Sequence, residues 1–403
     1  MQFSDLGLTR PELVEHLTQC GYWGDAHRRQ RHTYVLSPCA YVVSPAQHRQ
    51  LDELSRSTFR ALEHLQHDLW SVAQDAARPN AAARFLRLAT HASRGLLTPH
   101  DGRLDVPPYI KLDLVQTPAG EYRIVEVDAH NPRGLPYIAF LEGTPKLPDQ
   151  RYRGMDVLCA MLRRKTAPIT APWTLLVSHY ERYYLPAFEV LCDTLNQRGI
   201  ETRIVEEKDA AALLQEDASL HLLAIPESLC MYDGADSALR DTLMRRYRAG
   251  TLATLFPPAA YLGSKAFLPY LRAQPGMEAH MPPSALVGKG CATPHINGTP
   301  VVLKKAMSAG MKGVVMPGAP EFDIRLQEAQ AMHPSWIVQD MVEQEPLPVT
   351  VFTDTGERTT RAYYLRVTAY ASQHGIIYAE VTGRQTKDVH GAPDCIQVPT
   401  ILA

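Results

Sequence analysis

Long apolar segments are absent from this sequence. No run of about 18 apolar residues occurs in its 403 residues, so no segment is long enough to span a bilayer as a helix. The first ten residues, MQFSDLGLTR, also lack the basic and apolar regions of a secretory signal. We therefore expect a cytoplasmic protein with no membrane partner.

An excess of charge of either sign is absent as well. The 41 Lys and Arg residues and the 43 Asp and Glu residues leave a formal net charge of -2. A near-neutral chain has no broad cationic surface with which to hold nucleic acid or an anionic lipid surface. We expect no nucleic acid partner, and any recognition must depend on local groups of side chains.

Cysteine is sparse and scattered. The seven cysteines form no CxxC pair, which argues against a disulfide framework and favours reduced, mostly buried thiols. Cys20, His27, His32 and Cys39 could in principle make a zinc site with two cysteines and two histidines. Their spacings of seven, five and seven residues match no common zinc finger, so an ordinary structural role is the favoured interpretation.

Several catalytic signatures are missing too. The sequence contains no GxSxG, no HExxH, no GxGxxG opening a helix after a strand, and no GxxxxGK[ST]. These absences argue against the α/β-hydrolase, zincin, Rossmann and P-loop classes.

The chain is nevertheless long enough for several structural units. With 45% hydrophobic and 21% charged residues it has the composition of a globular protein, and its length exceeds what one core usually serves. Helical periodicity follows Ser44-Pro45, strand and helix patterns alternate after Trp173, and strand patterns dominate the last third. We expect an α+β fold whose units are 1–103, mainly helical; 104–170; 171–257, an α/β lobe; 258–345; and 346–403.

The densest group of chemically active residues lies on a predicted hairpin of segments 109–115 and 121–127. Residues two apart on a strand point to the same face, so Glu126 and Asp128 share a face, and a paired strand can bring Asp113 beside them. Carboxylates of this kind are the hard oxygen ligands that suit Mg²⁺. The alternative is a solvated polar face of a hairpin.

A second group follows an apolar strand in the final third. Lys304 leaves this strand, and the next residues include Ser308, Gly310, Lys312 and Gly313. One ammonium group and several backbone N–H groups placed in this way can surround a polyphosphate. The alternative is an ordinary hairpin with a surface lysine.

Taken in order, these segments resemble a circularly permuted ATP-grasp ligase of the glutathionylspermidine-synthase-like kind. Lys111-x-Asp113 and Glu126-Val-Asp128-Ala-His-Asn-Pro look like that family's Arg-x-Asp and Glu-x-Asn-Ala-Asp-Thr-Pro segments. As in the permuted family, the acids precede the nucleotide lysine instead of following it. The resemblance implies a circularly permuted ATP-grasp core with an inserted α/β pre-ATP-grasp lobe and an N-terminal helical region.

The resemblance also implies roles for individual residues. Asp113, Glu126 and Asp128 would be magnesium ligands, and Lys111 would be a catalytic phosphate contact. Either Arg384, which we favour, or Arg366 would stabilise the transferred phosphoryl group. The residues implied to bind ATP are Lys265, Lys304, Ser308, Gly310, Lys312, Gly313, Gln339 and Asp340.

The sequence departs from the family pattern at several positions. Lys111 replaces an arginine, so a bidentate phosphate contact becomes a point charge. Asp128 stands where the family has asparagine, and Lys305 stands where proline is common. No clear second lid lysine lies between 318 and 340.

The activity that the resemblance implies is ATP-dependent ligation of a carboxylate to an amine. Such an enzyme uses ATP and Mg²⁺ and forms an amide through an acylphosphate, here on an amino acid, small peptide or polyamine-like amine. A degenerate nucleotide-binding protein without ligase activity and a phosphotransferase are the alternatives. The expected partners are a small-molecule carboxylate and an amine, and a homodimer is a possible assembly.

Overall fold

The computed structural model describes residues 2–19, 35–77, 106–130, 133–166, 171–216, 220–226, 229, 237–288, 300–308, 313–331, 336–390 and 394–403. Among the helices in these ranges, none is long and apolar enough to cross a membrane. Cys20, His27 and His32 of the possible zinc site, and Gly310 and Lys312 of the glycine loop, lie outside the described residues.

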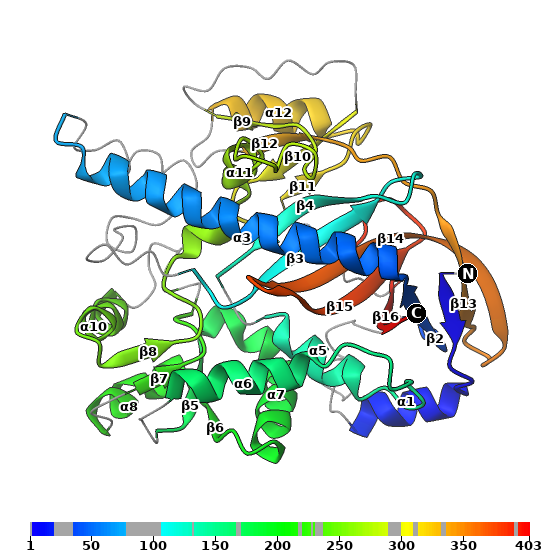
Figure 1. The fold of residues 1–403 in the computed structure, drawn as a ribbon, viewed down its shortest axis with the longest axis horizontal. Helices are drawn as coiled ribbons and strands as arrows, with labels where there is room; N and C mark the ends of the chain where they lie inside the picture. The colour runs from blue at the N-terminus through cyan, green and yellow to red at the C-terminus, as the bar shows by residue number, and fades with distance from the viewer. Residues whose placement is uncertain are drawn as a thin grey trace.

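A mixed sheet forms the centre of the molecule and takes strands from both ends of the chain (Figure 1). Its strands are β1 (Phe3–Asp5), β2 (Cys39–Val43), β3 (Ile110–Gln116), β4 (Tyr122–Asp128), β13 (Leu347–Phe352), β14 (Arg358–Ser372), β15 (Gly375–Arg384) and β16 (Ile396–Leu402). Their order is β1-β2-β16-β15-β14-β3-β4, and β13 pairs with β14. The pairing of β16 with β2 is parallel, and the other pairings are antiparallel.

The hairpin of acids predicted from the sequence is therefore the pair β3 and β4, and it lies at one edge of this sheet. The strands predicted in the last third are also observed as β13, β14 and β15. Two short N-terminal strands, β1 and β2, were not predicted, and they extend the sheet at its other edge.

A long helix, α3 (Pro45–Gln74), lies across the main sheet (Figure 1). It begins as the sequence predicts, because the Ser44 hydroxyl accepts the N–H of Gln47 and the Gln47 side chain accepts the N–H of Ser44. Pro45 occupies the first turn, where its missing N–H costs no helical hydrogen bond. The predicted apolar face is buried in the main core through Leu51, Leu54, Leu62, Leu65 and Leu69.

An α/β lobe follows, with the parallel pairing that the sequence predicts. Its strand order is β6-β5-β7-β8, and each neighbouring pair is parallel. Gly199 ends helix α7 with a φ of 75°, a conformation that favours glycine. The lobe contains β5 (Trp173–Val177), η1 (His179–Tyr184), α7 (Leu185–Gln197), β6 (Thr202–Glu206), η2 (Glu207–Asp209), α8 (Ala210–Glu216), β7 (Leu220–Leu222), α10 (Ser237–Arg248) and β8 (Leu252–Thr254).

A third sheet lies against the β4 edge of the main sheet (Figure 1). Its order is β11-β10-β12-β9, all antiparallel. It consists of β9 (Ser284–Val287), β10 (Val301–Lys305), β11 (Val314–Val315) and β12 (Trp336–Asp340), with α12 (Phe322–Ala331) packed on it.

Short helices join these units. The α5 helix contacts β15 and β16 of the main sheet and α7 of the lobe, and α6 contacts β15. These elements are α1 (Arg10–Gln19), α5 (Leu135–Glu142), α6 (Gly154–Thr166), η3 (Ala260–Gly263), η4 (Lys265–Phe267) and α11 (Leu268–Arg272).

Candidate functional site

A row of polar side chains crosses four adjacent strands of the main sheet. Glu126 on β4 pairs with Asp113 on β3, Asp113 pairs with Thr368 on β14, and Thr368 pairs with Glu380 on β15. Directly opposed residues point to the same face of a sheet, so these four side chains share one face. The Thr368 hydroxyl confirms this arrangement by donating to Asp113 Oδ1 at 3.0 Å.

Lys304 brings the third sheet into contact with this hairpin. Its Nζ atom donates to the carbonyl of Val125 on β4 at 2.9 Å and to Oε1 of Gln339 on β12 at 2.6 Å. The side chain is buried, and burial lowers the pKa of Lys304 to about 8, although the nearby Glu126 carboxylate acts in the opposite direction. Two residues that the resemblance assigned to ATP therefore lie directly beside the acids.

Lys265 is the second lysine at this junction. It lies on η4, and its Nζ atom is 3.0 Å from Glu126 Oε1 and donates to the carbonyl of Ser308 at 2.9 Å. The backbone N–H of Lys265 also donates to the carbonyl of Ala306 at 2.8 Å. One buried lysine thus links the acid hairpin to the start of the glycine loop.

The other two acids are also paired with cations. Arg366 Nη1 lies 3.3 Å from Asp113 Oδ2, and Lys111 Nζ lies 3.5 Å from Asp128 Oδ2. Asp128 also faces His130, whose Nδ1 is 2.8 Å from Oδ1. The register agrees with these contacts, since Lys111 pairs directly with Asp128.

These pairings perturb the protonation equilibria. Burial alone would raise the pKa of Asp113, but Arg366 and Lys111 lower it below its usual value. Asp128 shows the same balance, because His130 and Lys111 outweigh burial and hold its pKa well below the usual range. Burial alone would lower the pKa of Lys111, yet its acidic neighbours raise it. Asp113, Asp128 and Lys111 are therefore ionised together at neutral pH.

The three acids do not form a single metal-binding cluster. Within the described ranges, no three or more His, Cys, Asp or Glu side chains are gathered in a way that could hold a metal ion. Asp113 and Glu126 do face each other directly, and Mg²⁺ commonly binds one or two carboxylates together with water and phosphate oxygens. This pair therefore fits a magnesium ion that shares its coordination with a polyphosphate.

The charge and hydrogen bonding of the site also fit an anionic ligand. Four basic side chains, those of Lys111, Lys265, Lys304 and Arg366, lie beside the acid hairpin. Among the described residues, Gln339 Nε2 and Arg366 Nε are buried donors without a hydrogen-bond partner. Buried donors are rarely left in this state unless a ligand or water completes them.

The remaining predicted residues are placed as follows. Ser308 and Gly313 lie on either side of the loop, and Gly313 accepts from the Lys305 N–H at 2.6 Å. A Cβ atom at Gly313 would lie 2.6 Å from Lys305 Cβ, so this close approach requires glycine. Asp340 ends β12, and its N–H donates to Pro283.

Arg384 lies apart from the acids. Its guanidinium forms ion pairs with Asp388 and Asp394, and in the described part of the chain it makes no ion pair with the three acids. Of the two predicted arginines, Arg366 is the one that contacts an acid of the site directly.

Two residues next to the predicted acids were not identified from the sequence. Glu380 is 4% exposed at the end of the polar row, and burial raises its pKa to about 8. In the sequence, only the position of Glu380 on a predicted strand pointed to it. His130 packs so closely on Gly263 that a Cβ atom there would coincide with the imidazole ring. That histidine is part of the acidic motif, and only the fold shows that it orients Asp128.

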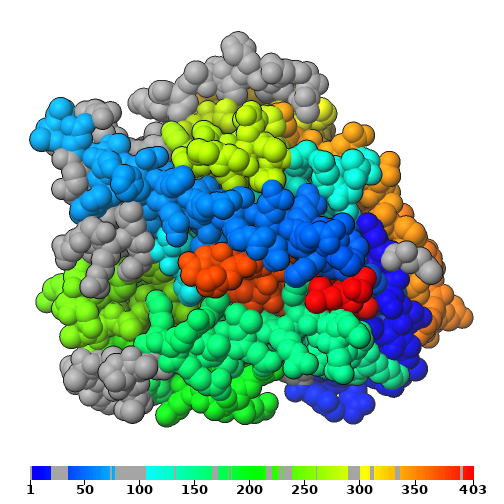
Figure 2. Space-filling model, in the orientation of Figure 1, coloured from blue at the N-terminus to red at the C-terminus, as the bar shows by residue number. Residues whose placement is uncertain are grey.

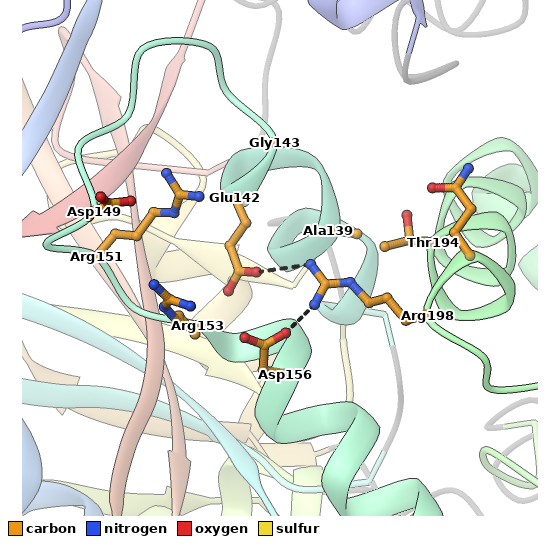
Figure 3. Close-up of a pocket in the computed structure, with 10 residues that line it drawn as sticks. Ala139, Glu142, Gly143, Asp149, Arg151, Arg153, Asp156, Thr194 and Arg198 are labelled. Carbon is orange, nitrogen blue, oxygen red and sulfur yellow. Dashed lines mark hydrogen bonds and ion pairs between the residues drawn. The ribbon is translucent and has the colours of Figure 1, made fainter.

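A separate polar pocket of about 580 Å³ lies between α5, α6 and α7 (Figure 3). Arg198 reaches from α7 and bridges Glu142 and Asp156. Glu142 also accepts the backbone N–H of Met155 at 3.2 Å, near the start of α6. None of the residues that line this pocket was singled out from the sequence, and these contacts give Glu142 and Arg198 a structural role in joining three helices.

The sequence matches no protein-family model and no curated protein. Its fold is similar to that of a glutathione synthetase-like effector from Globodera pallida, determined in its apo form. The TM-score is 0.51 at 11% sequence identity, and the alignment covers 99% of this chain and 98% of the other. The two chains thus share their overall architecture along nearly their whole lengths.

Proposed function

We propose that this protein is an ATP-dependent carboxylate–amine ligase with a circularly permuted ATP-grasp core. The observation that carries the proposal is the 2.9 Å hydrogen bond from Lys304 Nζ to the carbonyl of Val125. This bond joins a lysine from the last third of the chain to the acid hairpin that precedes it in sequence. The similarity to the fold of the glutathione synthetase-like effector supports the same proposal.

In this proposal the junction between the main sheet and the third sheet holds the nucleotide. Asp113 and Glu126 would hold Mg²⁺, while Lys265 and Lys304 would exchange their present acceptors for phosphate oxygens. Gln339 Nε2, a buried donor without a partner among the described residues, would hydrogen-bond the base. When bound, ATP with Mg²⁺ supplies the phosphoryl group that activates a carboxylate for attack by an amine.

The chain's own residues would act by positioning charge and excluding water. Arg366 is held by Asp113 at the floor of the site, where a fixed guanidinium can stabilise charge that develops on transferring oxygens. Lys111 is held in the same way by Asp128. Ser308 accepts from Lys265 Nζ beside Glu126, and a segment starting there would protect an activated carboxylate from hydrolysis if it closed over the bound nucleotide.

The test is an assay with ATP, Mg²⁺ and pools of amino acids, short peptides and amines. We expect ADP release that depends on substrate, together with a new product whose mass equals acid plus amine minus water. Glu126→Gln should abolish this turnover and leave the unfolding temperature within a few degrees of the parent protein. Glu121→Gln is the matched control, because Glu121 lies on the same hairpin and pairs with Arg123 away from the site.

A nucleotide-binding protein without ligase activity is the second candidate. The ion pairing of all three acids, and the lack of a three-ligand metal group among the described residues, favour it. Nucleotide binding without ADP release from any pool would support this candidate over the ligase. A phosphorylated product in place of an amide would identify a phosphotransferase.

A further inference from the structure

Glu380 is a buried carboxyl group that the proposed nucleotide site does not use. It is two strands from Asp113, which corresponds to about 10 Å across the sheet. The residue is 4% exposed, and the Gln397 side chain hydrogen-bonds its carboxyl group, while its Oε2 atom has no partner at hydrogen-bonding distance among the described residues. A buried carboxyl oxygen in this state costs free energy unless some other group satisfies it.

Tyrosine side chains lie on one side of this carboxyl group. The Tyr370 hydroxyl donates to the carbonyl of Gly134 at 2.9 Å and lies 3.4 Å from Glu380 Oε1. The rings of Tyr109 and Tyr378 lie 6.4 and 6.0 Å from the Tyr370 ring, centroid to centroid. A carboxyl group beside several aromatic faces is a suitable environment for an organic cation.

The oxygen atoms without hydrogen-bond partners at this cluster also suit a cationic ligand. In addition to Glu380 Oε2, the hydroxyl oxygens of Tyr109 and Tyr378 are buried without partners in the described part of the structure. Each of these oxygens can accept a hydrogen bond, and the charge of Glu380 acts on the Tyr378 hydroxyl, so the carboxyl group and that hydroxyl could both accept from one ammonium group. Burial raises the pKa of Glu380 to about 8, so the carboxyl group is protonated in the free protein at neutral pH, and a bound ammonium group would favour its ionised form.

The cluster adjoins the proposed nucleotide site through Arg366 and Lys111. The charges of Arg366 and Lys111 both act on Glu380, and their side chains are 25% and 27% exposed. Arg366 contacts Asp113, so it lies between the acids that would hold Mg²⁺ and the carboxyl group of Glu380. A ligand bound at Glu380 would therefore lie next to a carboxylate activated over Asp113.

We propose that Glu380 is the anchor for the acceptor substrate and holds it by an ammonium group, so that the acceptor is a primary amine that is cationic in solution. This inference rests on the proposed ligase function. The aromatic rings of Tyr370 and Tyr378 form the walls of this subsite. Glu380 thereby determines which class of nucleophile the enzyme takes.

The first experiment measures amine binding without catalysis. Glycine, ethanolamine, putrescine and spermidine are each added to the full-length protein, and the shift in unfolding temperature is recorded. Their N-acetylated forms serve as ligands in which the amine to be tested is blocked. At least one amine should stabilise the parent protein, its acetylated form should not, and Glu380→Gln should abolish the shift.

Two further variants control for indirect effects. Glu142→Gln removes another buried carboxyl group with a raised pKa, at a place outside the site, and should retain the amine-induced shift. Tyr378→Phe removes one unpartnered hydroxyl and should weaken amine binding several-fold without unfolding the protein. If no amine stabilises the parent protein, or if the shift persists in Glu380→Gln, the carboxyl group is structural and the inference is wrong.

The second experiment separates this inference from the ligase proposal. Hydroxylamine is uncharged at neutral pH, so it can capture an activated carboxylate without an ammonium anchor. Glu380→Gln should form hydroxamate from the carboxylate pool at a rate within about threefold of the parent, while its kcat/KM for the amine falls at least tenfold. Equal losses with both nucleophiles would overturn the inference but leave the ligase. Amine binding lost in Glu380→Gln, with no ADP release in any assay, would refute the ligase and leave an amine site.

Discussion

Lys265 Nζ lies 3.0 Å from Glu126 Oε1, and the same amine donates to the carbonyl of Ser308. One side chain therefore connects the acid hairpin of the main sheet to the loop that follows β10. Lys265 is buried, so its positive charge would destabilise the fold if Glu126 were absent. The lysine in turn stabilises the negative charge of Glu126. The site is held together by these cross-links in the state described here.

Lys304→Met should weaken ATP binding at least tenfold. The substitution removes the buried ammonium group that reaches both Val125 and Gln339, while it keeps most of the side-chain volume. Calorimetric titration with ATP and Mg²⁺ is the measurement. Lys305→Met is the matched control, since successive side chains on a strand point to opposite faces. Equal affinities in the two variants would remove Lys304 from the nucleotide site.

Arg366→Lys should lower kcat for ADP release at least tenfold with little change in ATP affinity. Lysine keeps the charge beside Asp113 but loses the planar fork that can hold two oxygens at once. Arg384→Lys should stay within about twofold of the parent protein, because Arg384 is engaged by Asp388 and Asp394. The reverse ranking would identify Arg384 as the arginine that contacts the transferred group.

The stability of the fold should depend on pH through Glu380. Burial raises its pKa from 4.5 to about 8, so the folded protein retains this proton over a range where the unfolded chain has lost it. Its contribution is complete below pH 4.5 and is lost as the pH rises through 8, by about 4 to 5 kcal/mol at most. Urea unfolding at pH 5 and pH 8.5 should show this loss in the parent protein and a smaller one in Glu380→Gln. An identical pH dependence in both would contradict the assignment.

Gly263→Ala should destabilise the protein by about 2 kcal/mol or more, because the new methyl group would occupy the space of the His130 ring. Displacing His130 would also release its contact with Asp128. The free energy of unfolding in urea is the measurement. Adding His130→Ala to Gly263→Ala should recover part of the loss, and a Gly263→Ala protein as stable as the parent would show that the two residues are not in close contact.

The sequence predicted the helices and strands that are determined by residues close together in the chain. The cap at Ser44, the hairpin of β3 and β4, and the parallel lobe all depend on residues near one another in the chain. The strand β1 has only three residues, too few for a pattern, and both β1 and β2 are strands because of their pairing with each other and with β16. Nothing near them in the sequence encodes that pairing.

The candidate site was predictable to a similar extent. Alternation along β4 places Glu126 and Asp128 on one face, and register extends that face to Asp113. The cations that neutralise them come from three different strands and a short helix, so only the fold shows which cation meets which acid. Glu380 was missed for the same reason, since its surroundings are built by residues distant in sequence.

The parallel pairing of β2 with β16 also constrains how the protein is made. Until Ile396–Leu402 has been made, β1 and β2 can pair only with each other, because β16 is the strand that joins them to the rest of the sheet. Because β16 lies far along the chain from β2, the sheet can close at this edge only after β16 has been made. Removing that final strand would divide the sheet into two pieces and detach β1 and β2 from the half that carries the acids.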